Sequence, residues 1–146
     1  HATGSGGTQA GLTAGAHLYD LDCPVIGMAV CDDAAYFQDK VRADLREWAA
    51  LYATGVAVDD LTIEVNDRYI GPGYGQATPE VFETIRLLAR TQGLVLDPVY
   101  SGKAFHGLLE EIRCGAFSST ADVVFIHTGG IFGLLAQADC VAESNK

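Results

Sequence analysis

The apolar residues of this chain fall into two short continuous runs and one alternating stretch, and each of these predicts a strand. Residues 24–31 (PVIGMAVC) and 123–127 (VVFIH) are nearly continuous apolar runs, the pattern of strands buried on both faces of a parallel sheet. Residues 60–70 carry alternating apolar positions at Leu61, Ile63 and Val65, which predicts a further strand or extended stretch.

Between these stretches, apolar residues recur every three or four positions, and capping residues mark the ends of the predicted helices. Asp32 and Asp33 are predicted to supply the N-cap and a first-turn negative charge for the longest helix, and Gly55 is its predicted end. Thr78 followed by Pro79 is typical of a helix start. The helices predicted in this way are residues 8–19, 34–55, 79–93 and 101–113.

The alternation of strands and helices indicates an α/β fold. A chain of 146 residues, of which 49% are hydrophobic, is long enough for one domain with its own core. Strands that are connected through helices run parallel, and their sheet is covered on both faces. We therefore expect a single unit over residues 1–146, with three αβα layers around a mostly parallel sheet.

Charge and cysteine spacing exclude several classes of function. The net charge of −10 argues against binding to nucleic acid or to an anionic membrane, because both require a basic surface. No apolar run reaches the roughly 18–20 residues of a membrane span. The four cysteines form no CxxC pair, so we expect no metal site, and instead buried thiols in the reducing cytoplasm.

Four loops rich in glycine, hydroxyl and tyrosine residues are candidates for a ligand site: residues 3–8, 71–75, 100–103 and 128–130. Loops at the carboxyl ends of parallel strands converge on one pocket. The first loop leads into a helix, and its free backbone N–H groups suit a phosphate. Its glycines lack the GxGxxG spacing of a dinucleotide site, and no lysine follows to make a P-loop. Taken singly, each loop is equally compatible with a tight turn.

Four motifs in this chain closely resemble a known enzyme family. They are TGSGGTQAGL (3–12), GPGYG (71–75), LLARTQGLVLDPVYSGKAFHGL (87–108) and VFIHTGG (124–130). The resemblance is to the carboxyl-terminal half of the fold-type II pyridoxal-phosphate enzymes, whose fold is that of the tryptophan synthase β subunit. The subgroup contains D-cysteine desulfhydrase, L-cysteate sulfo-lyase and 1-aminocyclopropane-1-carboxylate (ACC) deaminase.

The resemblance implies a role for several residues of these loops. Two tyrosines, Tyr74 and Tyr100, are expected to flank a small amino-acid substrate, where a phenol carries a proton or binds a carboxylate. A packed aromatic ring with a satisfied hydroxyl is the alternative for each. The residues expected to bind the phosphate of pyridoxal 5'-phosphate are Ser5, Gly6, Gly7 and Thr8.

Ser101 and Thr128 are the positions that bear on the substrate. The resemblance implies that Ser101 lies near the pyridine nitrogen of the cofactor, where ACC deaminases carry a glutamate, and that Thr128 replaces an apolar residue of those enzymes. A serine at a helix N-terminus does not share a proton with that nitrogen as a glutamate does. Both positions therefore favour β-elimination over opening of a cyclopropane ring. A simple N-cap is the structural alternative for Ser101.

The lysine that binds the cofactor covalently in this family comes from an amino-terminal segment, and none of Lys40, Lys103 and Lys146 matches it. Residues 1–146 are therefore expected to be the carboxyl-terminal portion of a homodimeric lyase, without the lysine-bearing portion and inactive alone. The expected reaction converts a cysteine-like amino acid to pyruvate, ammonia and sulfide or sulfite. The alternatives are ACC deaminase activity, or a non-catalytic phosphate-binding module that needs a partner chain.

Overall fold

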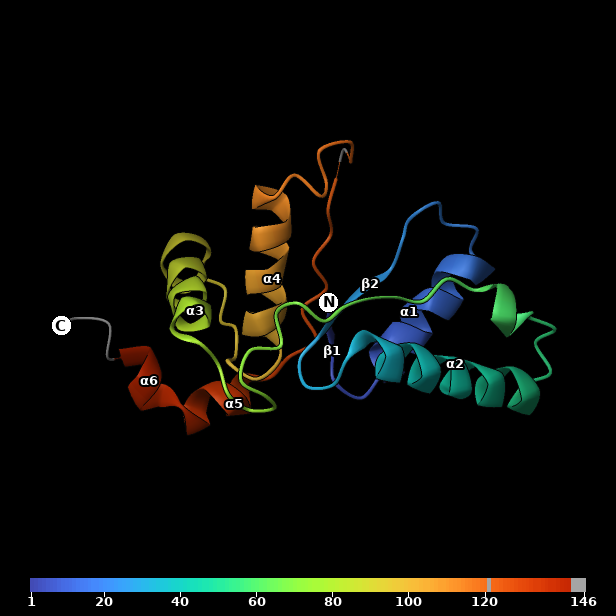
Figure 1. The fold of residues 1–146 in the computed structure, drawn as a ribbon, viewed down its shortest axis with the longest axis horizontal. Helices are drawn as coiled ribbons and strands as arrows, with labels where there is room; N and C mark the ends of the chain where they lie inside the picture. The colour runs from blue at the N-terminus through green and yellow to red at the C-terminus, as the bar shows by residue number, and fades with distance from the viewer. Residues whose placement is uncertain (121, 143–146) are drawn as a thin grey trace.

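A computed structural model describes residues 1–120 and 122–142, which form a small parallel sheet flanked by helices (Figure 1). The sheet contains β1 (Ala2–Thr3), β2 (Ile26–Ala29) and β3 (Glu64–Asn66), in the order β1-β2-β3. Both pairs are parallel, with Ala2 beside Met28 and Gly27 beside Val65. The predicted α/β class is confirmed.

One face of the sheet is covered by α1 (Gly7–Leu18) and α2 (Ala34–Leu51). The apolar stripes of these two helices pack against each other and against the segment that precedes β3. The buried residues of this cluster are Ala10, Ala14, Val41, Leu45, Val58, Leu61 and Ile63. Of the two aspartates expected at this helix start, Asp33 is the N-cap, because its Oδ1 accepts a hydrogen bond from Tyr36 N at 2.8 Å. The expected first-turn negative charge is absent, since both aspartates precede the first residue of α2. Between α2 and β3 lies a short 3₁₀ helix, Val58–Asp60.

The opposite face is covered by α4 (Ser101–Arg113), with α3 (Pro79–Gln92) packed beside it (Figure 1). Ala104 of α4 is buried against Ala2, Met28 and Val30 of the sheet. The boundaries of both helices agree with the sequence prediction, including Pro79 at the first turn and a left-handed Gly93 as C-cap.

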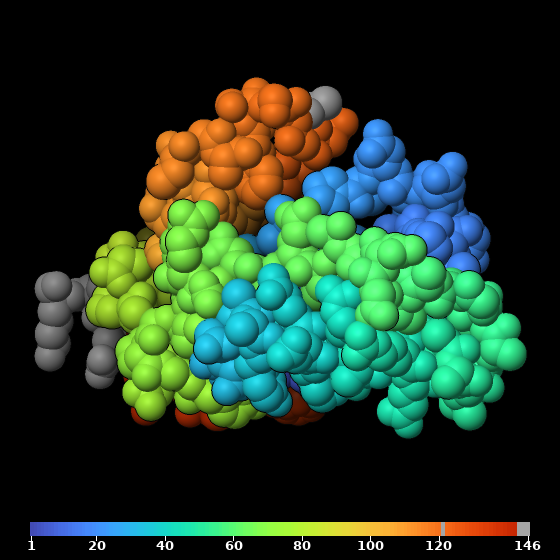
Figure 2. Space-filling view, turned by 45° about the vertical axis from the view of Figure 1, so that its right-hand side comes forward, coloured from blue at the N-terminus to red at the C-terminus, as the bar shows by residue number. Residues whose placement is uncertain are grey.

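Two short helices, α5 (Ile131–Ala136) and α6 (Ala138–Ala142), follow at the carboxyl-terminal end. Figure 2 shows the chain after β3, in green, lying across the front of the molecule between α2 and the α3–α4 pair. This segment leads from the sheet to the loop of residues 71–75.

Three sequence predictions of secondary structure need correction. Residues 123–127 form no strand: Phe125 packs against the β1–β2–α4 cluster, but Val124 is 81% exposed. The run is therefore only partly buried, through the Phe125 side chain, and does not have the two covered faces of a central strand. The strand predicted over residues 60–70 is limited to β3, and the long helix ends at Leu51, with Gly55 in the loop beyond it.

The prediction of buried thiols is also wrong. Cys23, Cys114 and Cys140 are exposed and Cys31 is half-buried, and all four are free. Cys23 lies in the loop before β2 and Cys114 directly follows α4, so both are outside the apolar clusters.

Among the described residues, no helix is both long enough and apolar enough to cross a membrane.

Candidate functional site

The turn between β1 and α1 presents the N-terminus of a helix with no side chain closing it. Gly6 adopts a left-handed conformation, with φ of 87°, and lets the chain turn directly into the helix at Gly7. No side-chain hydrogen bond caps this end, and the first turn contains no acidic residue.

These features fit the phosphate group of pyridoxal phosphate. The first N–H groups of a helix have no partner within it and carry a partial positive charge. Ser5 and Thr8 are exposed beside them and add two hydroxyl groups. An anion here would receive backbone and hydroxyl hydrogen bonds without a cationic side chain.

One cavity of about 480 Å³ lies in front of this turn. Residues from all four candidate loops line this cavity, although the loops of residues 71–75, 100–103 and 128–130 are far in sequence from the loop of residues 3–8. None of the lining residues is acidic, which favours an anionic ligand. The lining consists of residues 2–6 and 8–9, Tyr74, Tyr100 and residues 128–130.

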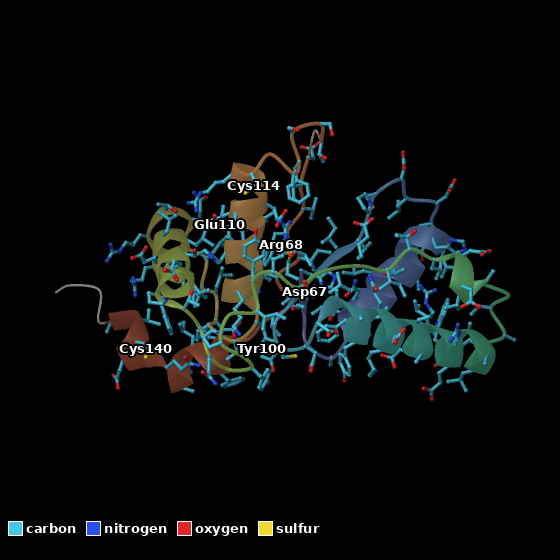
Figure 3. The ribbon with its side chains drawn as sticks, in the orientation of Figure 1. Asp67, Arg68, Tyr100, Glu110, Cys114 and Cys140 are labelled. Atoms are coloured by element: carbon cyan, nitrogen blue, oxygen red, sulfur yellow. The ribbon has the colours of Figure 1, made fainter. Side chains whose placement is uncertain are left out.

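Tyr74 and Tyr100 form a hydrogen-bonded pair at the wall of this cavity. Their hydroxyl groups are in contact, and their rings meet edge to face with centroids 5.9 Å apart. The hydrogen bond to Tyr74, together with burial, raises the pKa of Tyr100 to about 12. Tyr100 therefore holds its proton at neutral pH, and either hydroxyl of the pair can donate to the other. Figure 3 shows Tyr100 at the base of α4, at the end opposite Cys114.

Gly4 makes room for this arrangement. A Cβ atom at this position would lie 3.1 Å from Cε1 of Tyr100 and 3.2 Å from Cγ2 of Val30. Both approaches are closer than ordinary van der Waals contact. A glycine here therefore allows the Tyr100 ring to lie against the phosphate-type turn.

Ser101 lies behind the cavity wall and is 1% exposed. Its hydroxyl donates to Asp97 Oδ1 at 2.6 Å and accepts from Asp97 N at 3.0 Å. The N-cap position of α4 is Tyr100, and the carboxylate of Asp97 accepts from the backbone N–H groups of Val99, Tyr100 and Ser101, each at 2.8 Å. Ser101 is therefore not the N-cap that the sequence left open as its alternative role.

The loop of residues 128–130 is held by His127 and by contact with Asp97. His127 Nδ1 accepts from Gly129 N at 3.1 Å, and its Nε2 is 3.0 Å from Val95 O. Gly130 has φ of 112°, and a Cβ there would overlap the carboxylate of Asp97. This contact places the Thr128 loop beside the N-terminus of α4.

Six of the eight site residues predicted from the sequence line the cavity: Ser5, Gly6, Thr8, Tyr74, Tyr100 and Thr128. Gly7 begins α1 and Ser101 is buried against Asp97, so neither is part of the lining. Three further residues at the site, Asp97, Gln9 and the buried Lys103, were not predicted from the sequence. The dipeptide Asp97-Pro98, which favours the start of a turn, was a usable signal for the first of these. The structure contains no cluster of three metal-ligating side chains within residues 1–120 and 122–142.

Comparison with known proteins identifies the family. Residues 1–129 match the family model described as "Pyridoxal-phosphate dependent enzyme". The chain belongs to this family. The match covers β1, the turn before α1, both tyrosines and the start of the loop of residues 128–130.

Individual relatives and a solved structure agree with this assignment. The chain is 43% identical to a putative 1-aminocyclopropane-1-carboxylate deaminase of Thermotoga maritima, over 94% of this chain and 42% of that protein. It is 41% identical to the mitochondrial bifunctional D-cysteine desulfhydrase/1-aminocyclopropane-1-carboxylate deaminase of Arabidopsis thaliana, over 97% of this chain and 34% of that protein. A crystal structure of an ACC deaminase homologue matches with a TM-score of 0.85 and 37% identity, over 97% of this chain and 42% of that one. The chain therefore spans less than half the length of these relatives.

Proposed function

We propose that this chain supplies the phosphate-binding and substrate-facing portion of a pyridoxal-phosphate-dependent lyase. The observation that carries the proposal is one acid-free cavity that joins the open N-terminus of α1 to the Tyr74–Tyr100 pair. The substrate is a small amino acid with a sulfur substituent on its β-carbon. We further propose that the complete enzyme is a homodimer and acts in the cytoplasm, as the family resemblance implies.

Each group of residues has a defined task in this proposal. Backbone N–H groups at Gly6, Gly7 and Thr8, with the hydroxyls of Ser5 and Thr8, bind the cofactor phosphate. Bound pyridoxal phosphate supplies an electron sink for the negative charge that forms at the substrate α-carbon. The Tyr100 hydroxyl, kept protonated by Tyr74, donates a hydrogen bond or a proton to substrate or leaving group.

The covalent lysine and the base for the α-proton are assigned to the portion of the protein outside this chain. Lys103 is buried with its ammonium on three backbone carbonyls, and Lys40 is paired with Asp44. Lys146 lies outside the described residues. The much greater length of the relatives supports this division.

A sulfur leaving group is favoured by the surroundings of Ser101 and Thr128. The Ser101 hydroxyl proton points to Asp97, so position 101 offers a cofactor nitrogen no proton to share. The cofactor ring is then a weaker electron sink than one with a protonated nitrogen. Such a sink suits a reaction in which the β-substituent leaves quickly, because the negative charge at the α-carbon then has a short lifetime. The balanced reaction takes one amino acid and one water to pyruvate, ammonia and hydrogen sulfide, or sulfite when the substrate is a cysteate.

ACC deaminase activity is the second candidate, because relatives and a solved neighbour carry that name. A non-catalytic phosphate-binding module that needs a partner chain is the third. The three differ in what the protein releases: sulfide or sulfite with pyruvate, a four-carbon keto acid with ammonia, or no product.

The test is a product assay on the full-length protein, saturated with pyridoxal phosphate and incubated separately with D-cysteine, L-cysteate and ACC. The proposal expects sulfide or sulfite, in equal amount to pyruvate, from one sulfur substrate and at least about tenfold lower kcat/KM with ACC. Turnover of ACC alone would establish the second candidate instead. Saturable cofactor binding without any product would establish the third.

A further inference from the structure

Lys103 is a buried cation whose partners are all backbone carbonyl groups. It lies in the first turn of α4 and is 1% exposed. Its ammonium donates to Val30 O at 3.1 Å, Ile70 O at 2.7 Å and Gly73 O at 2.6 Å. Three donors thus meet three acceptors. Within residues 1–120 and 122–142 it forms no salt bridge.

This position is an unfavourable one for a cation. Burial removes the ammonium from water, and the N-terminus of a helix repels positive charge. Burial lowers the pKa of Lys103, although nearby Cys31 and Asp97 act in the opposite direction. The contribution of Lys103 to the structure therefore comes from its hydrogen bonds to the three carbonyl groups.

Two of these carbonyls belong to the segment that carries Tyr74. Gly71, Gly73 and Gly75 all have positive φ, and glycine backbones of this kind lose much conformational freedom when they are fixed. Two other side chains of the described residues bond this loop: Gln137 donates to Gly75 O at 3.0 Å, and the Tyr100 hydroxyl meets that of Tyr74. The ammonium of Lys103 therefore supplies the anchor directly before Tyr74.

The third carbonyl connects this anchor to the rest of the cavity. Val30 follows β2 and would contact a Cβ at Gly4, while Tyr100 lies one helical turn before Lys103. We propose that Lys103 is a positioning residue: its ammonium fixes the Gly71–Gly75 loop against β2 and α4 so that the Tyr74 hydroxyl meets that of Tyr100. The functional consequence rests on the proposed role of this pair, whereas the positioning itself does not.

The test compares the full-length protein with its Lys103→Met variant, whose unbranched side chain is one atom shorter and has no hydrogen-bond donor. Lys40→Met, at a partly exposed lysine of α2, is the matched control. We expect hydrogen exchange of peptides covering residues 70–76 to accelerate about tenfold or more in Lys103→Met, with α1 and α2 unchanged. In a spectrophotometric titration, the pKa of Tyr100 should shift from about 12 toward the ordinary value of about 10, whereas that of Tyr69, which is also raised to about 12, should not change.

Activity gives a separate readout if the protein is a lyase. Lys103→Met should lower kcat by about 10–100-fold with little change in KM, and it should have almost no further effect in a Tyr74→Phe background. If the wild type turns over no substrate, the proposed function fails, but the exchange and titration results still decide the positioning role.

Three outcomes overturn the proposal. Unchanged exchange over residues 70–76 in a folded Lys103→Met protein would show that the loop is held without the ammonium. Additive effects of Lys103→Met and Tyr74→Phe on kcat would show that Lys103 does not act through Tyr74. If Lys103→Met does not melt cooperatively, Lys103→Gln, which retains two N–H donors, takes its place. Loss of cooperative melting in both variants would show that Lys103 is required for folding of the whole chain and is not specific to this loop.

Discussion

Asp97 and Ser101 are joined by three hydrogen bonds within one buried turn. Ser101 N and Ser101 Oγ donate to Asp97 Oδ1 at 2.8 and 2.6 Å, and Asp97 N donates back to Ser101 Oγ at 3.0 Å. Both residues are 1% exposed. This turn fixes the start of α4, and with it the position of Tyr100 at the cavity wall.

The two residues should contribute unequally to stability. Ser101→Ala removes the hydroxyl alone and should lower the free energy of unfolding by about 1 kcal/mol. Asp97→Ala leaves the N–H groups of Val99, Tyr100 and Ser101 without their acceptor and should cost about 2–4 kcal/mol. Denaturant unfolding of the full-length protein measures both. The exposed Ser118→Ala is the control, and equal effects of Ser101→Ala and Asp97→Ala would contradict this description of the turn.

Gly129 and Gly130 provide a matched pair for the loop beside Asp97. Both have positive φ, of 103° and 112°, but a Cβ at Gly129 meets no atom within 4 Å, whereas one at Gly130 overlaps the Asp97 carboxylate. Gly129→Ala should therefore cost about 1 kcal/mol from backbone strain. Gly130→Ala should cost at least about 1–3 kcal/mol more, because the loop has to move. Similar melting temperatures for the two variants would show that the loop does not rest on Asp97.

Gln9 connects the phosphate-type turn to two strands. It is fully buried, its Oε1 accepts from Thr3 Oγ1 at 2.7 Å, and its Nε2 donates to Glu64 O at 2.6 Å. Gln9→Leu should lower the free energy of unfolding by about 2–3 kcal/mol, since it leaves a buried hydroxyl and a carbonyl unpaired. Gln38→Leu is the control, because Gln38 also bonds a carbonyl, Ile63 O at 3.3 Å, from an exposed position. Equal losses in both variants would contradict the importance of this contact.

Glu111 should make the stability depend on pH in the acid range. Burial raises its pKa, but hydrogen bonds from Tyr69 and Asn66 and the charge of Arg68 outweigh this and leave the pKa below its ordinary value. A carboxyl whose folded pKa is lowered adds stability above its unfolded pKa and loses it as the pH falls through the folded pKa.

The comparison of wild type with Glu111→Gln tests this assignment. The difference in free energy of unfolding should be about 1–3 kcal/mol at pH 7 and should shrink as the pH falls below about 4. Glu110→Gln, whose partner Arg113 is exposed, should change stability by less than about 0.5 kcal/mol at either pH. A Glu111→Gln difference that stays constant down to pH 2.5 would rule out a lowered Glu111 pKa.

The helix boundaries that the sequence revealed are those fixed by local chemistry. Pro79 and Gly93 limit α3 because proline suits a first turn and glycine accepts a left-handed C-cap. Asp33 caps α2 for the same kind of local reason. The strand predicted over residues 123–127 was wrong because its formation depends on tertiary packing. The apolar run VVFIH does not indicate whether one face of the segment or both will be covered by other elements.

The candidate site was predictable in its loops but not in its supports. The glycine and tyrosine motifs marked the residues that line the cavity, and Ser101 was placed there although its hydroxyl faces Asp97. Lys103 was considered only as a candidate for the covalent lysine, which it does not match. Its burial depends on carbonyl groups 30, 33 and 73 residues away, which no local pattern reveals.

The claim that the N-terminus of α1 holds a cofactor phosphate is tested most directly by two dissociation constants of the full-length protein, one for pyridoxal phosphate and one for pyridoxal. The double variant Ser5→Ala/Thr8→Val should weaken binding of pyridoxal phosphate about 10–100-fold and leave that of pyridoxal within about threefold. The control Ser118→Ala/Thr120→Val, at exposed residues away from the cavity, should change neither. Equal weakening of both ligands, or of neither, would contradict the assignment of this turn as the phosphate site.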